Sequence, residues 1–193
     1  NGNLLSYLEL SGSCYKQISD VFIDEKKQLY IYGAYLNDNF NTTTNCSCVF
    51  DSLTFSTNKK ETFLAKYDSL GNLLWVNTFG NDKRLTPDKF NIRNNAIYIS
   101  GRSSAATNFN FGSFLLNFPN NYTAGGFIAK YDTSGIFQWA KYYGVKGWDS
   151  SVSPLDLIIL DDNKIIVGGS VLTQSEPPHL YFQNATSLYG LPV

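Results

Sequence analysis

The chain has 193 residues and a mass of 21.6 kDa, enough for one domain with a sizeable core. Its 15 lysines and arginines nearly balance 16 aspartates and glutamates, and the formal net charge is −1. This balance gives no electrostatic reason to expect a nucleic acid or an anionic membrane surface as partner. Aromatic residues make up 16% of the chain, beside 15 glycines and no methionine, which is typical of strands and tight turns. No segment approaches the roughly 20 apolar residues of a transmembrane helix. We therefore expect an all-β domain without direct membrane insertion.

Two motifs recur along the chain. The segment 63–80 returns 64 residues later as 127–144, and a weaker copy of its second half lies at residues 2–12. The other motif begins with an aspartate and ends with a glycine 13 residues later. Its three copies start at Asp20, Asp88 and Asp156, at intervals of 68 residues. Such regular spacing indicates a repeated supersecondary unit.

Each unit is predicted to hold four strands, here called a to d, with side chains alternating at a period of two. We expect strand a at 20–24, 88–92 and 155–160, strand b at 29–36, 96–102 and 164–171, strand c at 62–67 and 126–131, and strand d at 72–79 and 136–143. Residues 3–10 are expected to be the d strand of a preceding unit, as in a mature fragment or an excised piece. Short Asp/Asn/Gly turns join a to b and c to d. The approximate units are 1–12, 19–80, 87–144 and 154–193, the last one incomplete.

A repeated four-stranded antiparallel unit is typical of a β-propeller blade. The sequence resembles the bacterial β-propeller repeat family (SBBP type), whose blades combine a D-x-hydrophobic-D start with an F-hydrophobic-A-K-hydrophobic-D-x-x-G-x-x-x-W segment. The matching positions are Asp20, Asp24, Tyr30, Gly33, Phe63, Ala65, Lys66, Asp68, Gly71 and Trp75, and in the second copy Asp88, Tyr98, Gly101, Phe127, Ala129, Lys130, Asp132, Gly135 and Trp139. The resemblance implies a β-propeller. The chain is long enough for about three blades, either as a partial propeller held by other chains or as part of a larger ring. It also implies part of a large secreted or surface-attached bacterial protein.

The longest connections are predicted to lie at one end of the units. The b–c segments 37–61 and 103–125 are each about 25 residues long, a third begins at residue 172, and the d–a segments are intermediate in length. Long loops on a rigid scaffold usually carry binding residues, and aromatic and amide side chains suit a protein or glycan partner. The candidate binding residues are Phe40, Asn41, Asn45, Phe109, Phe111, Tyr122, Trp148 and Tyr181. Alternatively, the loop aromatics fold back onto the unit or form an additional hairpin.

The three cysteines lie in connections at the same end of one unit. Cys14 is in a d–a segment, and Cys46 and Cys48 are in the next b–c segment, so a disulfide from Cys14 to either is expected; free thiols remain the alternative. A disulfide would indicate an oxidising compartment, and we expect an extracellular or cell-surface location.

Two kinds of sugar-attachment signal are present. Sequons for N-glycosylation occur at Asn41, Asn45, Asn121 and Asn184, although an Asn/Thr-rich sequence yields them by chance. Ser52 and Ser69 each lie in an Asp-Ser-Leu triplet that resembles a bacterial O-glycan acceptor, and turn chemistry explains the second triplet equally well.

No constellation of residues indicates catalysis. The repeated aspartates would either ring a channel and bind a cation or form a structural turn or cap, and their identical placement favours the structural role. The only histidine, His179, is interpreted as a surface residue, and we expect no catalytic residue, metal or cofactor. The leading hypothesis is a non-catalytic module that binds a protein, a glycan or other chains of a large surface assembly. The alternatives are a carbohydrate-active propeller with its site in the channel or in missing blades, and a structural spacer in a large adhesin.

Overall fold

The structure is a computed structural model that describes residues 8–37, 44–80, 85–103, 108–118, 124–145, 151–161, 164–172 and 180–182. In these ranges the chain is all-β with antiparallel sheets and contains no helix, which confirms the predicted fold class at that level. Accordingly, none of the described segments is a helix long and apolar enough to cross a bilayer.

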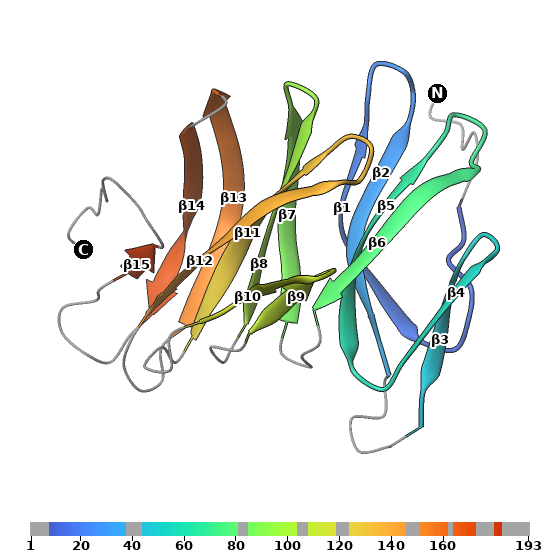
Figure 1. Cartoon of the computed structure of the whole chain (residues 1–193), viewed down its shortest axis with the longest axis horizontal. Helices are drawn as coiled ribbons and strands as arrows, with labels where there is room; N and C mark the ends of the chain where they lie inside the picture. Colours follow the sequence, from blue (N-terminus) through green and yellow to red (C-terminus); the bar gives the residue numbers. More distant parts are fainter. Residues whose placement is uncertain are drawn as a thin grey trace, which may run out of the picture.

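Three repeat units lie side by side. The first unit has the order β1 (Tyr15–Ile23), β2 (Leu29–Leu36), β5 (Lys60–Tyr67) and β6 (Leu73–Gly80). The second has β7 (Leu85–Arg93), β8 (Ala96–Ser103), β11 (Ala124–Asp132) and β12 (Phe137–Val145). The third consists of β13 (Ser151–Asp161) and β14 (Lys164–Leu172). Figure 1 shows the units next to one another, with the short turns at the upper end.

The predicted strands a to d of these units are confirmed, with small differences at their ends. Strand b of the first unit, residues 29–36, has the predicted bounds. Each a strand begins earlier than expected, because its pairing with strand b continues on the N-terminal side of a bulge. The expected strand at residues 3–10 lies mostly outside the described residues, and residues 8–10 are not in a strand.

An aspartate shapes both c–d turns and the a–b turn of the first unit. Asp68 Oδ1 accepts hydrogen bonds from the backbone N–H groups of Leu70 and Asn72, both at 2.9 Å. Asp24 and Asp132 accept the corresponding pair of bonds in their own turns. Such Asx turns explain why both c–d turns have an aspartate at the same position.

The long b–c segments are not plain loops, which corrects the simple loop expectation and matches the alternative of an additional hairpin. The first contains β3 (Cys46–Phe50) and β4 (Leu53–Thr57), and the second contains β9 (Phe109–Phe111) and β10 (Phe114–Leu116). These hairpins lie at the opposite end from the short turns (Figure 1). Among the described residues, one short strand, β15 (Leu180–Phe182), follows the third unit.

Each inserted element pairs with the end of the preceding d segment. Asn110 in β9 pairs with Gly80, and Tyr181 in β15 pairs with Gly144. Val49 in β3 forms the corresponding bridge with Ser11. Each long insertion therefore connects its own unit to the strand that precedes it along the chain.

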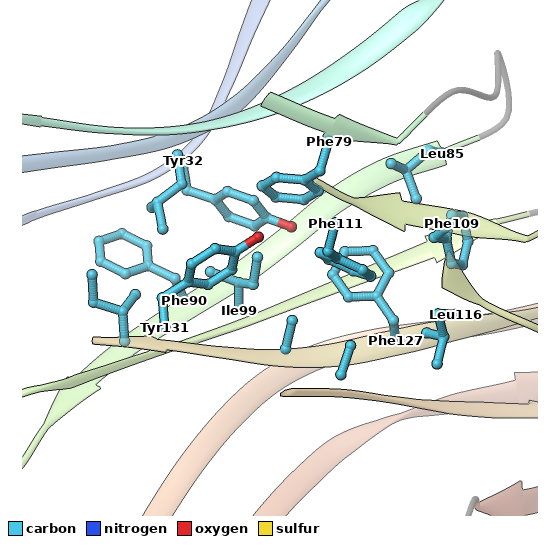
Figure 2. Packing of buried hydrophobic residues seen from close by; sticks show 14 of the residues in the cluster. Tyr32, Phe79, Leu85, Phe90, Ile99, Phe109, Phe111, Leu116, Phe127 and Tyr131 are labelled. Atoms are coloured by element: carbon cyan, nitrogen blue, oxygen red, sulfur yellow. The ribbon is translucent and has the colours of Figure 1, made fainter. Parts of the chain in front are cut away.

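The core is divided among the boundaries between units. Tyr32 and Phe79 of the first unit pack with Phe90 and Phe127 of the second, and Phe111 of the inserted hairpin completes this cluster (Figure 2). A second cluster joins the second and third units, and a third lies under the β3–β4 hairpin. Burial of aromatic faces between units therefore holds neighbouring units together.

Candidate functional site

Two of the predicted binding residues are core residues. Phe109 and Phe111 are 1% and 2% exposed, and the Phe111 ring contacts Phe79 and Phe127 with centroids 5.2 and 5.1 Å apart. Their assignment to a partner-binding surface is wrong, because the alternating inward positions of β9 point into the boundary between units (Figure 2). The outward positions of the hairpins are different residues, and Leu53, Phe114 and Leu115 are exposed there.

Two of the other loop candidates lie within the described residues. Asn45 is exposed just before β3, and the backbone of Tyr181 pairs in β15. The candidates Phe40, Asn41, Tyr122 and Trp148 lie outside the described residues, as do His179 and the sequons at Asn121 and Asn184.

The cysteines divide into one disulfide and one buried thiol. Cys14 pairs with Cys46, with Cα atoms 4.9 Å apart, and this bond ties the segment before β1 to the start of the β3–β4 hairpin. Cys48 is free and buried, and burial raises the pKa of its thiol to about 11. Cys48 is therefore a poor nucleophile, because the reactive thiolate is scarce at neutral pH.

The two serines considered for O-glycosylation are both exposed. Ser52 lies at the tip of the β3–β4 hairpin beside Asp51, and Ser69 lies in the turn shaped by Asp68. Their modification stays a prediction.

Two of the three repeated aspartates make similar contacts with the backbone. Asp20 Oδ1 accepts from the N–H of Val21 at 3.1 Å, and Asp20 Oδ2 accepts from the N–H of Phe90 in the next unit at 3.4 Å. Asp156 Oδ1 accepts from the N–H of Leu157 at 2.8 Å. Both satisfy backbone groups next to the bulge in strand a, which favours the structural interpretation.

Asp88 is the exception among the three. It is buried and pairs with Arg102 at 3.1 Å, while its Oδ2 atom has no hydrogen-bond partner among the described residues. Burial raises the pKa of Asp88 to about 7, although the positive charges of Arg102, Lys60 and Lys89 act in the opposite direction. The buried tyrosines Tyr32 and Tyr143 lie near enough for Asp88 to raise the pKa of each further, after the larger effect of burial.

The side chain of Asp88 is only 7% exposed. Its carboxyl group lies between the first and second units, and the cleft described below is lined by other residues. Within the described segments, no three His, Cys, Asp or Glu side chains are grouped so that they could hold a metal ion.

The surface that stands out is an apolar sheet face on β1. Val21 and Ile23 pair with Ile31 and Leu29 of β2, and with Ile18 they form the "β1 face", where all three side chains are exposed. Sequence reasoning placed strand a correctly but missed this surface, because the same positions would be buried if another unit covered them.

The residues equivalent to Val21 in the second and third units are buried. Val21 is opposite Ile31, Phe90 is opposite Ile99, and Leu157 is opposite Val167, so the three residues are equivalent by strand pairing. Phe90 is 8% exposed and Leu157 is 2% exposed, because the preceding unit covers each of them, whereas Val21 is 57% exposed.

A cleft of about 470 Å³ lies over the β1 face. It is lined by Leu8, Glu9, Leu10, Lys16, Ile18, Val21 and Ile31. Its apolar walls carry one acidic and one basic residue, a composition that suits contact with another protein surface.

Comparisons of the chain with family models, with curated proteins and with solved structures found no match.

Proposed function

We propose that this chain is a β-propeller segment of the SBBP type that acts as a non-catalytic, protein-binding module of a secreted or cell-surface bacterial protein. The observation that carries the binding role is the exposure of Val21 at a position where Phe90 and Leu157 are buried by a neighbouring unit. Contiguous exposed apolar residues of this kind typically mark an interaction surface.

The internal boundaries indicate how a partner would bind the β1 face. Phe90 is covered by the rings of Phe22 and Tyr32, with centroids 6.2 and 6.4 Å away. At the next boundary, Asn91 donates from its side-chain amide to the backbone carbonyl of Leu157 at 3.2 Å. A partner that offers aromatic side chains beside amide donors would reproduce both kinds of contact, so we favour a protein over a glycan.

The secreted location is supported by the Cys14–Cys46 disulfide, because disulfides persist in oxidising compartments and are rare in the cytosol. The non-catalytic role is supported by the similar structural use of Asp20 and Asp156, since a catalytic site normally assigns different roles to different residues.

Binding can be tested with a double variant, Val21→Asp with Ile23→Asp, against the wild-type chain. The matched control is Leu70→Asp, which introduces one charge at a fully solvated turn position. On a panel of purified extracellular proteins, we expect the double variant to lose at least about tenfold in affinity and the control to bind like the wild type. Equal binding by all three chains, or binding confined to a glycan array, would contradict the proposed surface. Turnover in a glycoside-hydrolase screen would contradict the non-catalytic role.

A further inference from the structure

The two inserted hairpins have equivalent tips. A two-residue turn joins Phe50 to the opposite Leu53 in the β3–β4 hairpin, and another joins Phe111 to the opposite Phe114 in the β9–β10 hairpin. The residue before each turn is buried, whereas Leu53 and Phe114 after the turns are 47% and 40% exposed. Differences between the two tips therefore reflect the turn residues and not a different place in the fold.

The first residue of the turn differs between the hairpins. Asp51 has a φ of 53°, and Gly112 at the same position has a φ of 60°, both in the left-handed region. A two-residue hairpin turn with this conformation at its first residue favours glycine, because a Cβ atom is strained there. Asp51 therefore carries a conformational cost that glycine avoids in the other hairpin.

The carboxylate of Asp51 makes no bond that would offset this cost. It is exposed, and within the described residues it has neither a hydrogen bond nor an ion pair. Strain that no local bond explains is typical of functional positions.

The aspartate of the other Asp-Ser-Leu triplet is used in a different way. Asp68 Oδ1 accepts from the backbone N–H groups of Leu70 and Asn72, and Asp68 Oδ2 accepts from the side-chain amide of Asn72, each at 2.9 Å. Both carboxylate oxygens therefore stabilise the turn itself. Turn formation explains why an aspartate is present at position 68, but it does not explain the one at position 51.

The hydroxyl group of Ser52 is accessible beside this free carboxylate. Ser52 is exposed at the hairpin tip and has no hydrogen bond within the part of the chain that the structure describes. The exposed side chain of Leu53 follows it. An enzyme can therefore contact a carboxylate, a hydroxyl and an apolar side chain next to one another, whereas Ser113 at the other tip follows a glycine and lacks the carboxylate.

We propose that Ser52 is an O-glycosylation acceptor, that a glycosyltransferase recognises it through Asp51 and Leu53, and that Ser69 is not an acceptor. Ser52 Oγ forms a bond to the anomeric carbon of a sugar that is activated as a diphosphate ester. The bond from that carbon to the diphosphate oxygen breaks, and the diphosphate leaves with the electron pair. A base of the transferase takes the serine proton. The free carboxylate of Asp51 attracts basic side chains of the transferase, and Leu53 contacts an apolar part of it.

Ser52 lies outside the β1 face. Only the bacterial, secreted location is shared with the function proposed above. Loss of binding at the β1 face would leave the modification of Ser52 unchanged, and an unmodified Ser52 would leave binding at the β1 face unchanged.

The experiment uses the full chain, secreted by the bacterium that encodes it, reduced and then digested with trypsin. Trypsin places the three turn serines in separate peptides, Ser52 in 28–59, Ser69 in 67–83 and Ser113 in 103–130. Mass spectrometry with fragmentation that retains sugars should show an added mass of at least one hexose on the first peptide, localised to Ser52. We expect no added sugar on the other two peptides.

Two variants should lose this added mass. Ser52→Ala removes the acceptor oxygen, and Asp51→Gly removes the carboxylate. Asp51→Gly should at the same time raise the Tm, because glycine adopts the left-handed conformation without strain. A misfolded hairpin therefore cannot explain its loss of sugar. Ser69→Ala is the matched control and should keep the modification of Ser52 in full.

Three outcomes would overturn the proposal. One is a secreted wild-type chain whose Ser52 is unmodified, including a chain whose sugar is confined to Ser69 or Asn45. Another is wild-type occupancy of Ser52 in Asp51→Gly. The third is a lower Tm for Asp51→Gly, which would remove the strain from which the role of Asp51 is inferred.

Discussion

The backbones of Gly80 and Asn110 pair across the boundary between the first and second units. Gly80 ends the d strand of one unit, and Asn110 belongs to the hairpin inserted into the next. The pairs Ser11–Val49 and Gly144–Tyr181 repeat this relationship, so each insertion extends the sheet edge that precedes it. Phe109 and Phe111, which were predicted to face a partner, instead pack between neighbouring units.

The hairpin should therefore matter for stability. Phe111→Ala removes a ring that packs against Phe79, Phe127 and Phe137, and we expect a loss of about 3 kcal/mol in the free energy of unfolding. Phe114→Ala, at an exposed position of the same hairpin, should cost less than about 1 kcal/mol. Urea denaturation measures both, and similar losses would show that Phe111 is not anchored as described.

The disulfide should stabilise the first unit. Cys14 and Cys46 are separated by 32 residues, and closing a loop of that length restricts the unfolded chain by about 3–4 kcal/mol in the chain-entropy account. The double variant Cys14→Ser with Cys46→Ser should lose stability by this order, and the wild type in reductant should match it. The Cys48→Ala variant keeps the disulfide, so its stability should fall in reductant as that of the wild type does. An unchanged urea midpoint of the wild type in reductant would rule out the bond as a stabilising element.

The buried carboxyl group of Asp88 predicts a dependence on pH. Its pKa rises from 3.8 in the unfolded chain to about 7 in the folded chain, so the folded state binds the proton more tightly. The contribution of this group to stability therefore falls as pH rises from about 4 to 7 and levels off above that range. Between pH 5 and 8, the free energy of unfolding of the wild type should fall by up to about 2 kcal/mol more than that of the Asp88→Asn variant. Urea midpoints across this range test the prediction, with Asp156→Asn as the exposed control. Parallel pH profiles for the wild type and Asp88→Asn would contradict it.

The turn between β1 and β2 can be improved. Lys27 has a φ of 60°, in the left-handed region, where the two c–d turns have Gly71 and Gly135. Glycine adopts this conformation without the steric cost that a side chain brings. We expect Lys27→Gly to raise the free energy of unfolding by about 0.5–1 kcal/mol. Lys26→Gly, one residue earlier and outside that region, should be neutral or destabilising. Thermal denaturation compares the two, and a lower Tm for Lys27→Gly would disprove the strain.

Local sequence predicted the strands and turns well. The alternation across residues 29–36 and the turn at Asp68 depend on contacts within a few residues, and both have the predicted form. The short strands β9 and β15 were not predicted as strands. Three residues carry little periodic signal. Besides the neighbouring β10, which pairs with β9, the strands that pair with β9 and β15 lie 30 or more residues away.

The sequence by itself determined the repeat, the antiparallel strand order within each unit and the end from which the long segments emerge. Period-two alternation and Asx turns are encoded by neighbouring residues, which is why these features could be derived without coordinates. Only the tertiary structure decided that Phe109 and Phe111 are core residues, that Cys14 pairs with Cys46, and that Val21 is exposed where Phe90 and Leu157 are buried. Each of these depends on which unit packs against which. Equivalent side chains in a repeat carry the same local signal whether or not a neighbouring unit covers them.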